Sequence, residues 1–479
     1  MGSNQSSYCY HQSNKFQGTS EQLQAIEQIQ SEFQITTDHM HAIVDQFIKE
    51  MQKGLDHHGA TVAMIPSFVS GRPTGEEKGK YLALDLGGTN LRVCQVELLG
   101  QGKYHLHQQK YVVSDQLKTG DMRHLCDFIA DCVDDFISEH GDPHEKVDMG
   151  YTFSFPIWQT SINSGELKQW TKGFACANAV GTDPAVLLQD AFHRKNLLVN
   201  IAAIVNDTVG TLMAHAYRHP ETTMGVILGT GSNTCYYEDI SRITKFEADN
   251  NKILSNEMVV NMEWGAFDCE RRILPFTMYD NKLNRESVNI NEQLFEKMIS
   301  GMYLAEIARN CMLHWIDRLV LFGGQSSPEL NMQWRFETAY MSTIHGDHSP
   351  NLTATKHVLE DIMDMPAGST TLADRQLVQA ICIAVGQRSA RLAACGLAGI
   401  IKHKKMINDD DDDKKNDCLI AIDGSLFEFY PEYEANMMSA LVDLFGEKIR
   451  HRVRFELSRD GSGLGASVIA MMASKMAKQ

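Results

Sequence analysis

The sequence contains no metal-binding or redox cysteine motif and no segment fit to cross a membrane. Its eleven cysteines in 479 residues are scattered, without a Cys-x-x-Cys pair, which excludes zinc-ribbon and thioredoxin-like motifs. Scattered cysteines in a chain of this size are typical of reduced, packed thiols in a cytoplasmic protein. No run of about 18 apolar residues occurs, so no membrane-spanning helix is expected. The polar first residues argue against a secretory signal peptide.

A basic surface is also absent. The formal net charge is −17, which argues against a nucleic acid as partner. The chain has no Walker A motif, no His-Arg-Asp or Asp-Phe-Gly pair, and no strand followed by Gly-x-Gly-x-x-Gly, so it lacks the usual phosphate-binding motifs. The remaining composition, 43% hydrophobic and 22% charged, is ordinary for a globular protein of about two or three domains.

Two segments stand apart by composition. Residues 1–20 are rich in Ser, Gln and Asn and are expected to form a disordered tail. Gly2 and Ser6 match the pattern for N-myristoylation, and Cys9 offers a second acylation site, which would give weak membrane association. A chance match in a polar tail is the favoured alternative. Residues 402–418, with five aspartates between lysine pairs, are expected to be a solvated loop rather than a metal site.

The stretch 81–99 has the most distinctive pattern. An apolar run ends in Asp85 and is followed by Gly-Gly-Thr-Asn at 87–90 and a second apolar run, which predicts strand, tight turn and strand. The glycines let the turn close and let backbone N–H groups approach an anion. A lone carboxylate in an apolar strand suits a metal–phosphate site; a plain β-hairpin is the alternative. A second strand–turn–strand follows at 224–237, about 140 residues later, which suggests a duplication. Two such hairpins facing each other would hold a polyphosphate.

Strands and helices alternate along the chain, which predicts an α/β fold with sites at the strand ends. Pro66 and residues 71–75 are expected to form a linker. Apolar periodicity predicts further strands at 104–113, 147–155, 197–205, 259–264, 418–423 and 452–456. It predicts helices at 21–33, 38–51, 122–139, 184–195, 208–216, 292–311 and 373–401, and from 465 to about 476.

Four polar residues permit two interpretations each. Asp207, between an apolar strand and a helix, is either an N-cap or the carboxylate that takes a proton from a substrate hydroxyl in phosphoryl transfer. Lys172 is either a surface lysine or a cation near developing phosphate charge. Glu263 and Glu296 are single acids among apolar residues. They suit the clamping of sugar hydroxyl donors, and a salt bridge or a helix-surface position is the alternative.

In combination, these motifs resemble those of the hexokinases, the single-unit eukaryotic hexokinases and glucokinases of the sugar kinase/actin/chaperone ATPase superfamily. The resemblance extends from about residue 25 to the C-terminus. It rests on Leu84–Arg92, Thr152–Pro156, Ile162–Phe174, Ile204–Thr211, Gly225–Asn233, Asn261–Phe267, Phe295–Gly301, Ile422–Ser425 and Asp460–Gly465.

The resemblance implies a two-domain, actin-like ATPase (ribonuclease-H-like) fold with a cleft between a small and a large domain. The small domain would hold residues 76–207, with the C-terminal helix 460–479 packed on it. The large domain would hold 21–75 and 208–459. The implied activity is ATP-dependent phosphorylation of the 6-hydroxyl of a hexose, most plausibly glucose, the first step of glycolysis. The domains would close on the sugar and exclude water.

The same resemblance assigns roles to single residues. Asp207, as general base, and Lys172 would be catalytic. Sugar contacts would come from Ser154, Phe155, Pro156, Thr171, Lys172, Asn206, Asp207, Asn233, Glu263 and Glu296. ATP contacts would come from Asp85, Gly87, Gly88, Thr89, Asn90, Arg92, Lys110, Gly229, Thr230, Gly231, Gly301, Thr338, Ser342, Gly424, Ser425 and Ser462. Mg²⁺ would travel with ATP, mostly through waters, with Asp85 nearby.

The chain departs from the family pattern at three positions. Met262 stands where a threonine is usual, Trp158 is bulky beside the sugar signature, and His345 stands where an acidic residue is usual. None removes a core catalytic group. Two other classes compete with a hexokinase. A catalytically silent sugar sensor would have lost the base or the phosphate turns, and a chaperone- or actin-like ATPase would lack the Ser-Phe-Pro and Thr-Lys segments. The base, the phosphate turns and the Ser-Phe-Pro and Thr-Lys segments are all present in this sequence.

Overall fold

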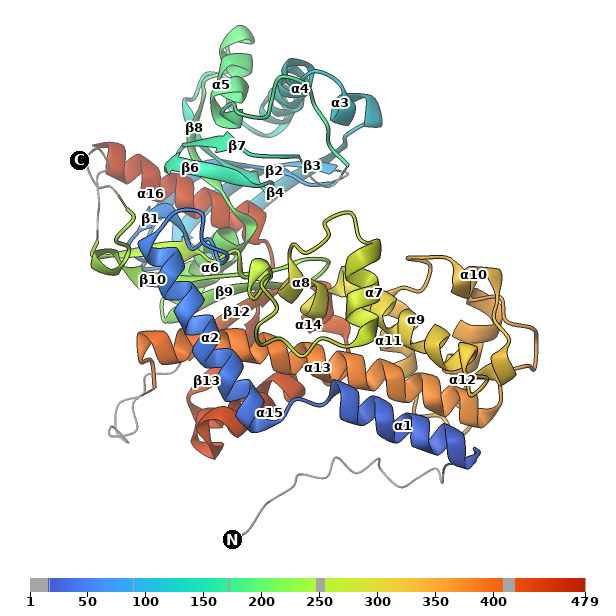
Figure 1. Ribbon diagram of the computed structural model, residues 1–479. Coiled ribbons are helices and arrows are strands. Elements are labelled where there is room, and N and C mark those ends of the chain that lie inside the picture. Colours follow the sequence, from blue (N-terminus) through green and yellow to red (C-terminus); the bar gives the residue numbers. More distant parts are fainter. Residues whose placement is uncertain are drawn as a thin grey trace.

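Two separate β-sheets organise the chain, and each forms the centre of one lobe (Figure 1). The structure is a computed structural model that describes Phe16 and residues 18–88, 90–170, 173–246, 255–407 and 418–478. Gly2, Ser6 and Cys9 of the predicted acylation pattern lie outside the described residues, as does the aspartate run. None of the helices in the described ranges combines the length and apolar character that a bilayer-spanning segment needs.

The small lobe, at the top of Figure 1, is built on a five-stranded sheet in the order β4-β3-β2-β5-β8. Strands β2, β5 and β8 are parallel, and β3 and β4 continue antiparallel from β2. The strands are β2 (Lys78–Leu86), β3 (Asn90–Gly100), β4 (Lys103–Val112), β5 (Val147–Phe153) and β8 (Val199–Val205), with a separate hairpin of β6 (Ile157–Ser161) and β7 (Ser164–Leu167).

Both faces of this sheet are covered, because alternate strand residues point to opposite sides. Leu82, Leu84 and Leu86 of β2 belong to a core shared with helices α4 and α5, whereas Ala83 belongs to a second core shared with α6 and α16. The helices of this lobe are α3 (Asp115–Thr119), α4 (Met122–His140), α5 (Pro184–Arg194) and the C-terminal α16 (Ala466–Lys478), which packs on β2, β5 and β8.

The large lobe is built on a six-stranded mixed sheet in the order β1-β11-β10-β9-β12-β13. Its strands are β1 (Ile65–Ser70), β9 (Thr222–Leu228), β10 (Ser232–Asp239), β11 (Glu257–Asn261), β12 (Cys418–Asp423) and β13 (Val453–Leu457). The expectation that Pro66 belongs to a linker is wrong, since it lies in β1 and pairs with Val260. This strand is at the sheet edge and has a register shift after Pro66, and an edge strand tolerates a residue without a backbone N–H.

Helices form most of the large lobe. They are α1 (Ser20–Phe33), α2 (Thr37–Asp56), α6 (Asp207–Arg218), α7 (Met278–Glu286), α8 (Leu294–Ile299), α9 (Gly301–Asp317), α10 (Pro328–Asn331), α11 (Thr338–His345), α12 (Thr353–His357), α13 (Leu372–Lys404), α14 (Ser425–Phe429) and α15 (Tyr433–Phe445). The 33-residue α13 runs through the lobe and packs against α1, α2, α9, α11 and α15 (Figure 1).

Two glycines of α13 allow neighbouring aromatic rings to pack directly against its backbone. An ideal Cβ at Gly396 would lie 2.8 Å from the ring of Trp264, and one at Gly399 would lie 2.8 Å from the ring of Phe47. The prediction of a single helix over 292–311 is wrong, because Ser300 interrupts the helix and separates α8 from α9. The strand expected to reach residue 264 ends earlier, at Asn261.

The two lobes meet where α6 crosses the π-helical turn Gly461–Gly465 that precedes α16. An ideal Cβ at Gly465 would lie 2.0 Å from the carbonyl oxygen of Gly210, and one at Gly210 would lie 2.5 Å from that of Gly461. Only residues without a side chain allow these two backbones to approach so closely.

Candidate active site

Three predicted site segments begin where parallel strands of the small-lobe sheet end. In the sheet register Asp85 of β2 lies beside Thr152 of β5, and Thr152 lies beside Val205 of β8. Asp85, Ser154 and Asp207 therefore stand at the same edge of the sheet. In an α/β fold, ligands bind at this carboxyl edge.

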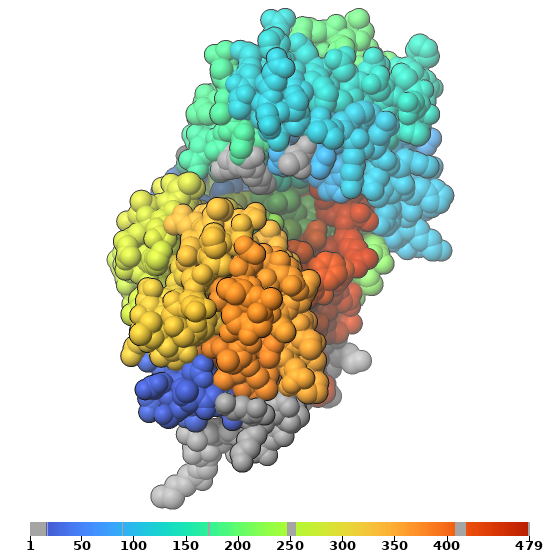
Figure 2. All heavy atoms as spheres, turned by 90° about the vertical axis from the view of Figure 1, so that its right-hand side faces the viewer, coloured from blue at the N-terminus to red at the C-terminus, as the bar shows by residue number. Residues whose placement is uncertain are grey.

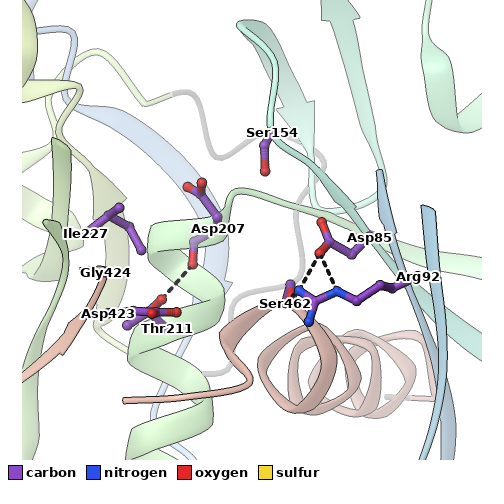
Figure 3. Close-up of a pocket in the computed structure, with 9 residues that line it drawn as sticks. All are labelled: Asp85, Arg92, Ser154, Asp207, Thr211, Ile227, Asp423, Gly424 and Ser462. Carbon is purple, nitrogen blue, oxygen red and sulfur yellow. Dashed lines mark hydrogen bonds and ion pairs between the residues drawn. The ribbon is translucent and has the colours of Figure 1, made fainter. Parts of the chain in front are cut away.

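A pocket of about 270 Å³ opens at this edge between the lobes. The space-filling view shows the groove that separates the small lobe from the large lobe (Figure 2). Polar side chains dominate the lining, and they come from both lobes (Figure 3). The pocket is lined by Asp85, Arg92, Ser154, Asp207, Thr211, Ile227, Asp423, Gly424 and Ser462.

Asp207 is the first residue of α6, and its carboxylate extends from the helix start into the pocket (Figure 3). The N-cap is Asn206, whose side-chain oxygen accepts the Thr208 N–H at 2.9 Å. The carboxylate oxygen Oδ1 of Asp207 accepts from the N–H of Thr208 at 2.8 Å and from its hydroxyl at 3.3 Å. Among the residues that the structure describes, none donates to Oδ2. Asn206 thus does the capping, and one oxygen of Asp207 faces the pocket.

Asp85 is held by Arg92, its partner across the β2–β3 hairpin. The guanidinium donates to Oδ2 of Asp85 from Nε at 3.1 Å and from Nη2 at 2.6 Å, and Nη2 also contacts the hydroxyl of Ser462 (Figure 3). Burial alone would lower the pKa of Arg92, but the Asp85 carboxylate raises it above the usual value. The turn closes through a bond from the Gly87 N–H to the carbonyl of Asn90 at 3.0 Å.

The second glycine-rich turn joins β9 to β10 and meets two further predicted ATP segments. The N–H of Gly301, at the start of α9, donates to the carbonyl of Gly229 at 2.8 Å, and the N–H of Met302 donates to Thr230 at 3.1 Å. Gly424 has φ = 133°, and an ideal Cβ there would lie 2.2 Å from the carbonyl oxygen of Leu228. The three glycine segments therefore pack backbone against backbone, next to the pocket that Gly424 lines.

Three of the predicted sugar contacts form a polar cluster in the large lobe. The side-chain amide of Asn233 donates to Oε1 of Glu263 at 3.1 Å, and its oxygen accepts the Glu263 N–H at 3.1 Å. Asn261, which was not predicted as a site residue, donates to the same Glu263 oxygen at 2.8 Å. Glu296 accepts the N–H of Ser232 at 2.9 Å. Glu263 has φ = 54°, which the bonds on both its backbone and its side chain fix in place.

Asp423 is a pocket residue that the sequence reasoning missed. It ends β12, so the strand-end rule that singled out Asp85 could have found it. Burial and the neighbouring Asp207 carboxylate raise the pKa of Asp423. Thr211, also missed, lies one turn after Asp207, and its hydroxyl donates to the Asp207 carbonyl at 3.0 Å. Ile227 supplies an apolar wall.

The remaining predicted residues lie in different surroundings. Phe155 is buried against Phe153, Trp170 and Phe174, so its ring supports the loop that carries Ser154. Pro156 is exposed. Lys110 is exposed on β4 directly across from Arg92. Two of the predicted ATP contacts are hydroxyls that donate to backbone carbonyls. Thr338 donates to Gly301 at 2.5 Å and Ser342 donates to Phe429 at 3.0 Å. Gly88, Asn90, Gly231 and Ser425 lie in or beside the two turns and at the start of α14, and Thr89, Thr171 and Lys172 lie outside the described residues.

The positions that depart from the family pattern do not line the pocket. Met262 is fully buried in the large core. The Trp158 ring is exposed and packs against His58, with ring centroids 4.6 Å apart. His345 is buried beside Glu432.

The pocket suits a divalent cation that binds oxygen. Asp85, Asp207 and Asp423 bring three carboxylates to one cavity, and Mg²⁺ prefers oxygen ligands and keeps several waters. Burial and then the neighbouring Asp207 carboxylate raise the pKa of Asp423, and a cation in the pocket would relieve the repulsion between the two carboxylates.

Comparison with known proteins gives a consistent result. Family models described as "Hexokinase" match residues 25–217 and 223–472. The chain is 37% identical over 457 residues to Hexokinase-1 of Schizosaccharomyces pombe (94% of this chain, 91% of that protein). It is 38% identical over 469 residues to a glucokinase of Aspergillus niger (90% and 93%). The solved hexokinase of Schistosoma mansoni complexed with glucose superposes with a TM-score of 0.81 at 33% identity, covering 95% of this chain and 99% of that one.

Proposed function

Since this chain belongs to the hexokinase family, and so is a phosphotransferase with an alcohol group as acceptor, we propose that it transfers the γ-phosphoryl group of ATP to the 6-hydroxyl of glucose. One observation carries the proposal. A single pocket holds the Asp207 carboxylate and the Asp85–Arg92 pair, so a carboxylate suited to accept a proton and the base of the first glycine-rich turn face the same space.

Asp207 is the general base of this proposal. The hydroxyl oxygen of the sugar forms a bond to the γ-phosphorus as the bond from that phosphorus to the bridging oxygen of ADP breaks. The hydroxyl proton passes to the carboxylate, for which Oδ2 is suited because Oδ1 already accepts two bonds from Thr208. In phosphoryl transfer the protein mainly positions groups and stabilises charge. Lys172 would neutralise charge on the transferring group.

The sugar would bind through acceptors on the large lobe and Ser154 on the small lobe. Asn233 and Glu263 hold each other in place, so both side chains are oriented before a ligand arrives, which lowers the ordering cost of binding. Carboxylates and amides suit hydroxyl donors. Two relatives support glucose as the sugar substrate in this proposal, namely the glucokinase and the glucose-bound hexokinase structure.

ATP would bind between the two glycine-rich turns, with Arg92 and Lys110 as nearby positive charge. Mg²⁺ would neutralise charge on the triphosphate, held through waters by Asp85 in company with Asp423. Residues 76–207 and the C-terminal helix would form one domain and the remainder the other, with closure around the segments that cross between the lobes. Closure would exclude water as a competing acceptor.

A coupled assay for glucose 6-phosphate with Mg·ATP tests the proposal. Asp207→Asn should lower kcat by about 10²–10⁴-fold, the usual contribution of a general base, and keep measurable glucose binding. Asp190→Asn, an exposed aspartate on α5, is the matched control and should keep wild-type kcat. Wild-type protein that binds glucose without turnover would instead identify a sugar sensor. A kcat of Asp207→Asn within tenfold of wild type would remove Asp207 as the base.

A further inference from the structure

Two histidines and a glutamate converge outside the pocket, where α6 packs beside β13. His215 lies in the last turn of α6 and His219 directly follows the helix, with the two ring centroids 4.8 Å apart. Oε2 of Glu456, on β13, lies 3.3 Å from Nε2 of His215 and 3.9 Å from Nε2 of His219. All three side chains offer a ligand atom within 4.8 Å of the others.

The histidines are oriented as metal ligands usually are. Nδ1 of His215 lies 2.8 Å from the hydroxyl of Thr222, and that hydroxyl donates to the carbonyl of His219 at 2.6 Å. A hydroxyl bonded to Nδ1 in this way fixes the His215 ring and leaves Nε2 to face a metal ion.

The cluster is accessible from solvent on one side. His215 is 4% exposed, whereas the side chains of His219 and Glu456 are 38% and 36% exposed. Arg218, Glu221 and Arg454 also face it. Arg454 lies 3.8 Å from Oε1 of Glu456 and 3.9 Å from Glu221, so it engages the carboxylate oxygen that points away from the histidines.

We propose that His215, His219 and Glu456 form a binding site for a divalent transition metal of the Zn²⁺ class, with a fourth position open to water. Two imidazoles and one carboxylate form a common three-ligand set for Zn²⁺, which takes N and O ligands at about 2.0–2.2 Å. Neighbouring ligand atoms in a tetrahedral site are then about 3.3 Å apart, close to the separation of His215 and Glu456. Imidazole ligands select against Mg²⁺, which prefers oxygen.

The site differs from the pocket in both place and chemistry. His215 is eight residues beyond Asp207 on the same helix, about 12 Å at the rise of an α-helix. A bound metal would tie α6 to β13, the strand that leads into Ser458. The hydroxyl of Ser458 bonds the Thr211 carbonyl at 3.4 Å. Metal binding would therefore stabilise the folded chain, because the unfolded chain lacks the assembled site.

Titration of the full-length chain with ZnCl₂ in a buffer without ATP tests the proposal, since ATP itself binds metals. Wild type should bind with saturation, give the visible absorption of low-coordinate Co²⁺ when Co²⁺ replaces Zn²⁺, and unfold at a higher Tm with metal. His219→Ala and Glu456→Gln should each weaken binding by about tenfold or more and lose the Tm increase. His193→Ala, an exposed histidine on α5, should titrate as wild type does.

The alternative is a cluster held together by hydrogen bonds alone. Titrations of His219→Ala and Glu456→Gln that match wild type would overturn the proposal, as would wild type without saturable binding. Neither result bears on phosphoryl transfer, because the three residues lie outside the pocket.

Discussion

The ion pair between Arg388 of α13 and Asp280 of α7 provides a sharp test of what stabilises the large lobe. The guanidinium donates to both carboxylate oxygens, from Nη2 at 2.6 Å and from Nη1 at 2.7 Å. The side chains are 0% and 3% exposed. The replacement Arg388→Met keeps the helix propensity and much of the volume, and it leaves the Asp280 carboxylate buried without its cation.

The expected cost is about 3–5 kcal/mol of unfolding free energy, because a buried charge loses its partner. Asp280 also accepts from the N–H of Thr277 at 2.8 Å and from its hydroxyl at 2.6 Å, in the capping box of α7. In Asp280→Leu/Arg388→Met the buried charge is gone and only the side-chain half of the capping box is lost, since Thr277 still accepts the backbone N–H of residue 280, which costs about 1 kcal/mol or less. The double variant should therefore be more stable than Arg388→Met alone.

Urea unfolding followed by tryptophan fluorescence and circular dichroism measures these differences. Arg391→Met is the matched control, since Arg391 is one turn further along α13 and pairs with Asp443 at 2.7 Å, with side chains 15% and 33% exposed. Arg391→Met should lose at most about 1 kcal/mol of unfolding free energy. The reasoning is refuted if Arg388→Met loses no more than Arg391→Met, or if the double variant is less stable than Arg388→Met.

Three other outcomes are expected. Hydrogen bonds from His403, Tyr236 and Lys404 outweigh burial and lower the pKa of Glu238 from 4.5 to about 2. The unfolded chain therefore takes up this proton first, and of about 3 kcal/mol of stabilisation present well above pH 4.5, about 1 kcal/mol is lost by pH 3.5. Unfolding free energies measured from pH 6 to 3.5 should show this loss in wild type and not in Glu238→Gln. Arg92→Gln should raise KM for ATP by about tenfold or more and leave glucose affinity unchanged; an unchanged KM would remove Arg92 from the ATP site. Gly465→Ala should lower the Tm, since a Cβ there would lie 2.0 Å from the Gly210 carbonyl oxygen. A wild-type Tm would contradict this, because it would mean that the two backbones can separate at little cost.

The sequence predicted the α/β class and most long elements, because their apolar periods are unambiguous. Helix 122–139 and strand 418–423 are two examples, observed as Met122–His140 and Cys418–Asp423. Prediction from the sequence failed where tertiary packing determines the secondary structure. Ser300 breaks a continuous helical period because the N–H of Gly301 bonds the carbonyl of Gly229, a contact that no local pattern records. Short helices such as α10 and α12 carry too few residues to show a period.

Only some residues of the candidate site could likewise be predicted from the sequence. Asp85, Ser154 and Asp207 could be predicted because each follows a recognisable strand, and the structure brings all three to one pocket. Asn261 was missed as a site residue because its role depends on a partner far along the chain, Asn233, whose side-chain amide donates to the Asn261 oxygen. Asp423 ends β12, and the strand-end pattern that indicated Asp85 could have found it. The ring of Phe155 contributes to packing, which its place in the Ser-Phe-Pro signature does not reveal.

The order of strands in the large sheet has a consequence for how the chain emerges from a ribosome. Strand β1 pairs Ile65 with Asn261, and among the described residues no strand before β11 pairs with it, while α1 and α2 rest on α13. The small-lobe sheet, in contrast, is complete once residue 205 has been made. Strand β1 therefore waits until β11 has been made, and helices α1 and α2 wait until α13 has been made, with apolar faces uncovered in the meantime. Such delayed long-range pairing is slow and open to aggregation, so chaperone demand during synthesis should fall on the first seventy residues.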